Sequence, residues 1–150
     1  MHMLCYLPAD LPSVHPVRRL LLNPPAYSTR EIYDSIASLH RRLARPGEPD
    51  LVLALVFTCE ADLDRVMALA HLCLHRDILV IIPQAQPALQ TKAHRLRPRF
   101  ITSLDGDPEE FSAVLRRLAD GYQNGRRGPA CNRITMSKQP PAAWASKASF

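Results

Sequence analysis

The chain has no long apolar segment: its longest uninterrupted apolar run, Leu51 to Phe57, is seven residues. A membrane-spanning helix needs about 20 such residues, so we expect none and no membrane contact. The first twelve residues lack the charged start and the apolar stretch of a secretory signal peptide. We therefore expect no signal peptide and a cytoplasmic protein.

Glycine is scarce, with five residues against fourteen prolines in a chain of 150. The phosphate-binding patterns GxGxxG and GxxxxGK[ST] and the nucleophile pattern GxSxG are absent. Such loops use glycine to bring the backbone close to a phosphate or to make a sharp turn. The sequence thus argues against these nucleotide-binding and hydrolase classes, and we expect no cofactor.

Paired cysteines are also lacking: the four cysteines, at 5, 59, 73 and 131, form no CxxC motif. A chain long enough to bury a hydrophobic core does not need a disulfide scaffold, which again indicates a reducing compartment. His71 and His75 would share a helical face, but no third ligand accompanies them. We predict no metal site.

Basic charge is confined to one end of the chain. Residues 1–120 hold 14 Lys and Arg and 14 Asp and Glu, whereas the last thirty residues hold five basic residues and no acid. A domain built to bind nucleic acid normally carries its own basic excess. The sequence therefore allows nucleic-acid binding through the tail only.

Apolar patterning alternates between strands and amphipathic helices. It predicts strands over 3–7, 51–57, 78–82 and 100–103, and helices over 28–45, 60–76, 87–97 and 107–121. Ser28 and Glu31 have the spacing of a capping box, Asp107 that of an N-cap, and Gly121 that of a C-terminal cap. The Pro-rich segment 8–27 is irregular by pattern, and 17–22 within it fits either a strand or a helix.

Alternation of this kind predicts an α/β fold, a three-layer α/β/α sandwich around a mainly parallel sheet of four to five strands. We expect one domain over residues 1–121. Residues 122–150 show no sustained apolar period and are rich in Gly, Pro, Ser, Asn and Ala. We predict that they form a disordered basic tail.

Chemistry in such a fold gathers where parallel strands end. There the sequence places Asp10, Thr58 to Glu60 with Asp62, Gln84 to Gln86, and Ser103 to Asp107. The carboxylates of Asp10, Glu60 and Asp105 are suited to Mg²⁺, but acids at these points also serve helix starts and turns.

Cys59 precedes a predicted helix, a position that can lower a thiol pKa, and the sequence leaves its reactivity open. Cys59 and Arg65 have the C-x5-R spacing of tyrosine phosphatases, but the loop between them holds three carboxylates and no glycine. Such a loop repels a phosphate. The enzymatic alternative is a small α/β enzyme whose site uses Cys59, Glu60, Ser103 and Asp105.

A second group of residues suits a protein partner. No acid lies between residues 86 and 104, a segment that holds four basic side chains, and two arginines follow on the last helix. The residues of this predicted contact are Lys92, Arg95, Arg97, Arg99, Arg116 and Arg117. We expect a protein partner or a homodimer.

Three segments carry a resemblance to a known family: Asp50-Leu-Val-Leu-Ala-Leu-Val56, Asp77-Ile-Leu-Val-Ile-Ile-Pro83, and Phe100-Ile-Thr-Ser-Leu104 followed by Asp107-Pro-Glu-Glu-Phe111. They resemble the second half of a response-regulator receiver domain, which has a flavodoxin-like (CheY-like) fold. The resemblance implies signalling by protein contact. It also implies an output surface on the family's fourth and fifth helices, where the basic residues named above fall.

The family's chemical residues are not carried over. The phosphoacceptor position falls on Leu55, the switch Ser/Thr position on Ile82 and the lysine position on Ser103. Tyr6-Leu-Pro stands where the family has paired acids. The resemblance therefore implies a degenerate receiver-like domain that is not an enzyme, has no catalytic residues and regulates without phosphotransfer.

Overall fold

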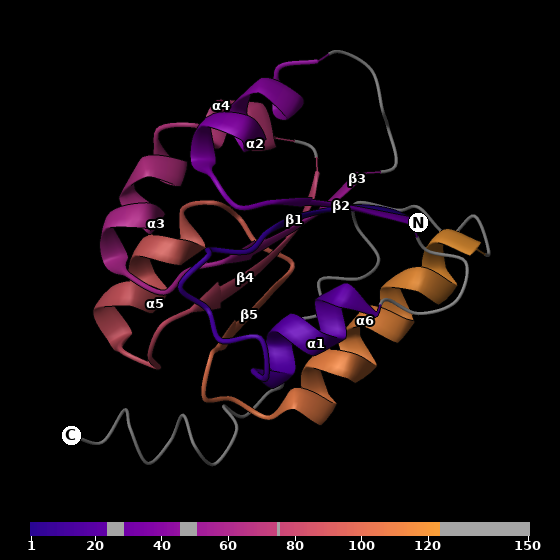
Figure 1. The fold of residues 1–150 in the computed structure, drawn as a ribbon. Coiled ribbons are helices and arrows are strands. Elements are labelled where there is room, and N and C mark those ends of the chain that lie inside the picture. The colour runs from indigo at the N-terminus through magenta and orange to yellow at the C-terminus, as the bar shows by residue number, and fades with distance from the viewer. Residues whose placement is uncertain (24–28, 46–50, 75, 124–150) are drawn as a thin grey trace.

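Five strands and six helices alternate along the chain in the computed structural model, which describes residues 1–23, 29–45, 51–74 and 76–123 (Figure 1). The strands are β1 (His2–Tyr6), β2 (Thr29–Tyr33), β3 (Leu51–Val56), β4 (Asp77–Ile82) and β5 (Phe100–Ser103). The helices are α1 (Pro16–Leu22), α2 (Ile36–Leu43), α3 (Glu60–Met67), α4 (Ala70–Cys73), α5 (Pro87–His94) and α6 (Pro108–Gln123).

All strand pairs are parallel, and the sheet order is β2-β1-β3-β4-β5. The chain winds first toward one edge of the sheet and then, from β3 on, toward the other. This is the doubly wound, flavodoxin-like arrangement, and it confirms the predicted α/β fold class.

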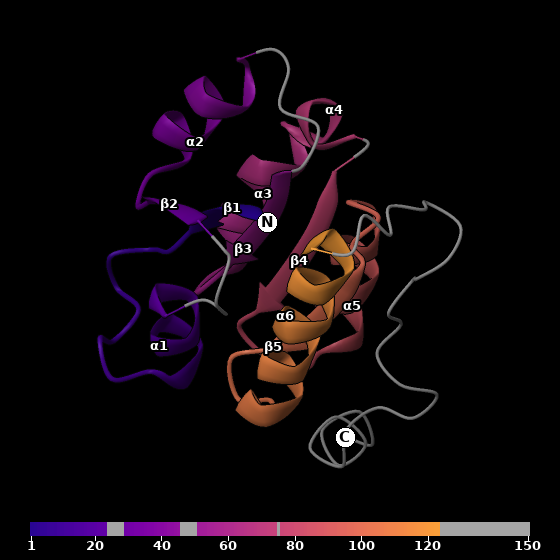
Figure 2. The ribbon, with the colours of Figure 1, turned by 90° about the vertical axis from the view of Figure 1, so that its right-hand side faces the viewer.

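Helices cover both faces of the sheet, which makes three layers. In two perpendicular views α1 and α6 lie on one face, and α2, α3, α4 and α5 lie on the other (Figures 1 and 2). Successive residues of a strand point to opposite faces, so β1 supplies both cores. Leu4 and Tyr6 pack toward α2 and α3, whereas Met3 and Cys5 pack toward α1 and α6.

Strand β3 lies at the centre of the sheet, and all six of its residues are buried. A central parallel strand has helices on both sides, so it must be apolar on both faces. Leu53, Leu55 and Val80 are fully buried, as the uninterrupted apolar runs predict.

The helix predicted over 28–45 is wrong in its first part. Residues Thr29–Tyr33 form β2, which pairs with β1, and the helix begins only at Ile36. Its N-cap is Ser35, whose hydroxyl accepts a 3.2 Å hydrogen bond from the Ser38 amide. Glu31 bonds to α2 and β1 side chains instead of closing a capping box. Ser28 lies outside the described residues.

The Pro-rich segment is not irregular throughout, because residues 16–22 form α1. Pro16 occupies the first turn, where its missing N–H costs no hydrogen bond, and the His15 side chain accepts from the Val17 amide at 3.2 Å. Because α1 has only seven residues, the segment between β1 and α2 is long enough to hold both α1 and β2. The structure thus decides the open choice at 17–22 in favour of helix.

Two other helices have boundaries that differ from the prediction. The helix predicted over 60–76 is interrupted and forms α3 and α4, and α6 continues through Gly121 to Gln123. Residues 124–150, most of the predicted tail, lie outside the described part of the chain. Among the residues that the structure describes, no helix is long and apolar enough to cross a membrane.

Candidate functional site

At the carboxyl edge of the sheet, the ends of β1 and β3 are filled by aromatic side chains. The rings of Tyr6 and Phe57 lie 6.2 Å apart, and both residues are buried. The Tyr6 hydroxyl donates a 3.0 Å hydrogen bond to the Asp62 carboxylate of α3. Burial, followed by this hydrogen bond, raises the pKa of Tyr6. Aromatic side chains thus fill the ends of β1 and β3 at this edge.

Other carboxylates of this edge also have partners within the chain. The Thr58 hydroxyl donates to both oxygens of Asp10, at 2.9 and 3.0 Å. The Ser103 hydroxyl donates to Asp105 at 2.5 Å. The turn that follows requires glycine, because a Cβ at Gly106 would lie 2.6 Å from Oγ1 of Thr102. Ser103 and Asp105 therefore form part of a tight turn into α6.

Lys92 bridges α5 to α3. Its ammonium lies 2.5 Å from Oε1 of Glu60 and 2.8 Å from Oδ1 of Asp64. The hydrogen bonds that Lys92 donates, to Asp64 above all and then to Glu60, raise its pKa, as expected for a cation between two carboxylates. Glu60, a predicted metal or catalytic residue, is consequently paired with a cation, and Lys92 points toward α3.

Leu55, Ile82 and Ser103, the positions matched by pattern to the receiver family, lie on the neighbouring strands β3, β4 and β5. Leu55 pairs in register with Tyr6 of β1 and Val80 of β4, and it is fully buried. Ile82 pairs with Ser103 of β5. A nucleophilic carboxylate and a lysine would be needed to accept and hold a phosphoryl group, and these positions offer Leu55, Ile82 and Ser103 instead.

Cys59 is exposed and occupies the N-cap position of α3 without capping it. Cys5 and Cys73 are buried, and burial raises their pKa values to about 12 and about 11. Within the described ranges, no three His, Cys, Asp or Glu side chains are grouped so that they could hold a metal ion. Asp10, Glu60 and Asp105 each bond to a different neighbour instead.

The six predicted contact residues differ in their exposure and in their partners within the chain. Lys92 faces α3, and Arg99 makes a 2.8 Å ion pair with Asp77 at the start of β4. Arg95 and Arg97 are exposed just after α5, and Arg97 has a positive φ of 53°. That backbone conformation favours glycine and costs an arginine stability.

On α6, Arg116 and Arg117 point in different directions. Consecutive helical residues lie about 100° apart around the axis. Arg116 faces α1, where it lines a groove, and Arg117 is exposed further round the helix. Of the predicted contact residues, Arg95, Arg97 and Arg117 are therefore the exposed residues outside this groove.

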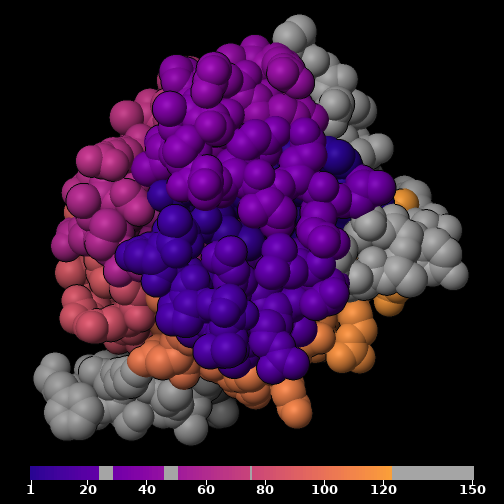
Figure 3. Space-filling model, in the orientation of Figure 1, coloured from indigo at the N-terminus to yellow at the C-terminus, as the bar shows by residue number. Residues whose placement is uncertain are grey.

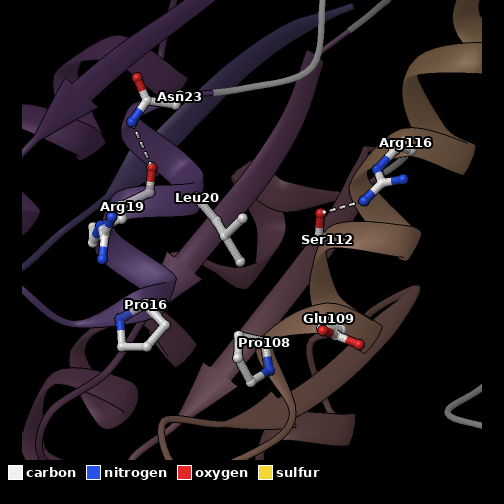
Figure 4. Close-up of a pocket in the computed structure, with 8 residues that line it drawn as sticks. All are labelled: Pro16, Arg19, Leu20, Asn23, Pro108, Glu109, Ser112 and Arg116. Atoms are coloured by element: carbon white, nitrogen blue, oxygen red, sulfur yellow. Dashed lines mark hydrogen bonds between the residues drawn. The ribbon is translucent and has the colours of Figure 1, made fainter.

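A groove between α1 and α6 is the concave surface that sequence analysis missed (Figure 4). Its volume is about 720 Å³, and it is shallow and open to solvent. Leu20 points into it, and Pro16 and Pro108 face each other at one end (Figure 4). Its full lining is Pro16, Arg19, Leu20 and Asn23 from α1 and Pro108, Glu109, Ser112 and Arg116 from α6.

The groove joins segments that are far apart in the chain. In the space-filling view the N-terminal part of the chain covers most of one face, and atoms of α6 border it (Figure 3). The helical spacing of apolar residues on α6 predicts which side of the helix faces the core, but it does not predict which helix lies beside α6. Because residues 17–22 fit either a strand or a helix by pattern, the sequence alone did not predict α1.

Two further charged networks stabilise the fold away from the carboxyl edge. Glu31 accepts from the buried Arg42 at 3.1 Å, from His2 at 2.7 Å and from Tyr33 at 3.0 Å. The Arg42 hydrogen bond above all lowers the pKa of Glu31 to about 2. Near the end of α6, the Tyr122 hydroxyl donates to Asp77.

Comparison with known proteins gave no match to a protein-family model, to a curated protein or to a solved structure.

Proposed function

We propose that the protein is a non-catalytic, receiver-like signalling module that regulates a partner by protein contact, without phosphotransfer. The observation that carries this proposal is the state of the carboxyl edge. Tyr6 and Phe57 fill the ends of β1 and β3, and Leu55 is buried at the phosphoacceptor position. A phosphoryl group would have no carboxylate to attack it there.

The carboxylates that remain at this edge serve the fold. Asp62 binds Tyr6, Asp10 binds Thr58, and Glu60 binds Lys92. Each bond joins segments distant in sequence, so each supports the tertiary structure. At this edge, which holds substrates in other doubly wound proteins, these three carboxylates are engaged in hydrogen bonds within the chain.

We assign partner contact to the exposed arginines beside β5. Arg95 and Arg97 project near the end of α5, and Arg117 lies on α6, which flanks β5 on the other side of the sheet (Figure 2). An exposed arginine held at positive φ costs stability that a glycine would avoid. A binding role for the Arg97 side chain explains that cost, and its positive charge points to an acidic partner surface.

Phosphotransfer is tested by intact-mass spectrometry after treatment with acetyl phosphate and Mg²⁺. We expect no gain of a phosphoryl group. A stable gain that is lost on Glu60→Gln or Asp62→Asn would show that a phosphoacceptor exists at this edge, and it would overturn the proposal. A gain lost only on Cys59→Ser would favour a thiol enzyme.

Partner contact is tested by affinity capture from the native host with the full chain. A protein captured by the parent should be lost with Arg95→Glu/Arg97→Glu. The matched control is Arg41→Glu/Arg45→Glu, which reverses the exposed arginines on α2 and just after it, away from α5 (Figure 1). A captured protein that both variants retain, or that only the control loses, contradicts the proposed contact surface.

A further inference from the structure

The groove between α1 and α6 carries charged side chains that the chain does not neutralise. Arg19 and Glu109 are exposed, and within the described residues neither side chain makes an ion pair. Arg116 is exposed, and among the described residues its side chain bonds to the Ser112 hydroxyl, at 3.2 Å, which uses one of its five donors. By contrast, the acids of the carboxyl edge have partners within the chain.

The charges along helix α6 are ordered so that they complement those of a second, antiparallel α6. Two acids, Glu109 and Glu110, stand at its start, and two bases, Arg116 and Arg117, stand seven residues later. The small residues Ser112 and Ala113 lie between them, and both are partly exposed. The helix dipole accounts for acids in the first turn, but it does not account for the arginines, because the last turn of α6 holds no basic residue.

Two such helices packed antiparallel bring the acidic start of each beside the arginines of the other. A two-fold axis between Ser112 and Ala113 pairs Glu109 with Arg116 of the second copy, and the reverse. Small residues at the axis let the two helices approach closely. Each favourable charge pair occurs twice, as in any isologous interface.

The second wall of the groove fits the same arrangement. Helices α1 and α6 run in the same direction, with Pro16 and Pro108 at one end and Asn23 and Arg116 toward the other (Figure 4). An antiparallel second α6 therefore places its acidic start at the end where Arg116 stands. Its Ser112 and Ala113 lie over Leu20, the apolar floor.

We propose that this groove binds a second copy of the chain, which forms a two-fold dimer through antiparallel α6 helices. This inference goes beyond the proposed function, because it uses a different surface from Arg95 and Arg97. Charge complementarity selects a second copy over an acidic peptide, because the groove holds Glu109 as well as Arg19 and Arg116. A uniformly acidic occupant would be repelled at the Glu109 end.

Sedimentation equilibrium of the purified full chain tests the dimer. We expect a monomer–dimer equilibrium whose dissociation constant rises with salt, because exposed charge pairs are screened. Glu109→Arg and Arg116→Glu should each weaken the dimer about tenfold or more, since each creates two like-charge contacts per dimer. The double variant Glu109→Arg/Arg116→Glu exchanges the charges and should recover most of the lost affinity.

Cross-linking gives a second readout that does not depend on charge. In a chain with Cys59→Ser and Cys131→Ser, Ala113→Cys lies next to the two-fold axis and should form a disulfide-linked dimer on mild oxidation. Ala88→Cys, at an exposed position on α5, is the matched control and should stay unlinked. Far-ultraviolet circular dichroism and a thermal melt establish that every variant is folded.

Several results would overturn the proposal. One is a full chain that stays monomeric at all concentrations. Another is a full chain that stays monomeric but dimerises once residues 124–150 are removed, which would mean that the tail occupies the groove. Another is a dimer that neither single charge reversal weakens, or one that cross-links through Ala88→Cys and not Ala113→Cys. None of these results depends on phosphotransfer or on the captured partner, so this proposal and the proposed function can fail separately.

Discussion

The carboxyl edge of the sheet and the α1–α6 face both carry acids and bases, but they use them differently. At the edge, Asp62, Asp10 and Glu60 bond to side chains of other segments. On the α1–α6 face, Arg19 and Glu109 point to solvent without an ion pair among the described residues. Charges that are satisfied inside the chain stabilise a fold, whereas charges left at a groove are available to a partner.

The largest effect should come from placing a charge at the filled edge. Leu55→Asp buries a carboxylate that has no cation beside it, and we expect a loss of about 4 kcal/mol or more in the free energy of unfolding. Leu74→Asp is the control, since Leu74 is 54% exposed, and it should cost less than about 0.5 kcal/mol. Urea titration measures both. Equal stability of the two variants would mean that the end of β3 is open to water.

A moderate effect should come from the Glu31 network. The pKa of Glu31 is lowered to about 2 from an ordinary value of 4.5, so its contribution is complete above pH 4.5 and disappears as the pH falls from 4.5 to 2. Because 35% of the side chain is exposed, solvent screening should hold the contribution to about 1 kcal/mol. Glu31→Gln should melt below the parent at neutral pH.

The pH dependence of this difference provides the control. Thermal melts of the parent and Glu31→Gln should converge toward pH 2, because protonated Glu31 no longer attracts Arg42. Asp120→Asn removes an exposed carboxylate that makes no ion pair among the described residues, and it should show no comparable loss at neutral pH. A difference between parent and Glu31→Gln that is constant from pH 7 to pH 2 contradicts the assigned network.

Thiol labelling should separate the edge from the interior without changing stability. Cys59 is exposed and should react with iodoacetamide in the native protein. Cys5 and Cys73 should stay unlabelled at neutral pH, because they are buried and their pKa values are raised to about 12 and about 11. Peptide mass mapping after labelling reports each site. Native labelling of Cys5 would show that β1 is accessible.

The smallest effect on stability should come from removing residues 124–150. The described elements end at Gln123, so the melting temperature should change little. Affinity for polyanions should be lost, because the formal net charge of +5 is equalled by the five basic residues of this segment. Fluorescence anisotropy with a labelled DNA duplex at two salt concentrations measures it. Salt-sensitive DNA binding that survives truncation would shift the site to Arg95 and Arg97.

Most of the sheet could be predicted from the residues alone. The doubly apolar runs predict β3 and β4 because only a strand covered on both faces needs such a pattern. Asp107 predicts the start of α6, and its carboxylate does accept a hydrogen bond from the Glu109 amide at 2.9 Å. The burial of Leu55 likewise follows from the apolar run in which it stands.

The features that depend on partners distant in the chain could not be predicted locally and were set by the packing of the whole domain. The Ser28-to-Glu31 pattern predicts a helix start, but the segment became β2 because β1 supplies its hydrogen bonds and Arg42 supplies a cation for Glu31. The groove likewise exists only because α1 and α6 pack side by side. Local patterns record which side of an element is apolar, whereas the neighbour that covers it is chosen by the packing of the whole sheet.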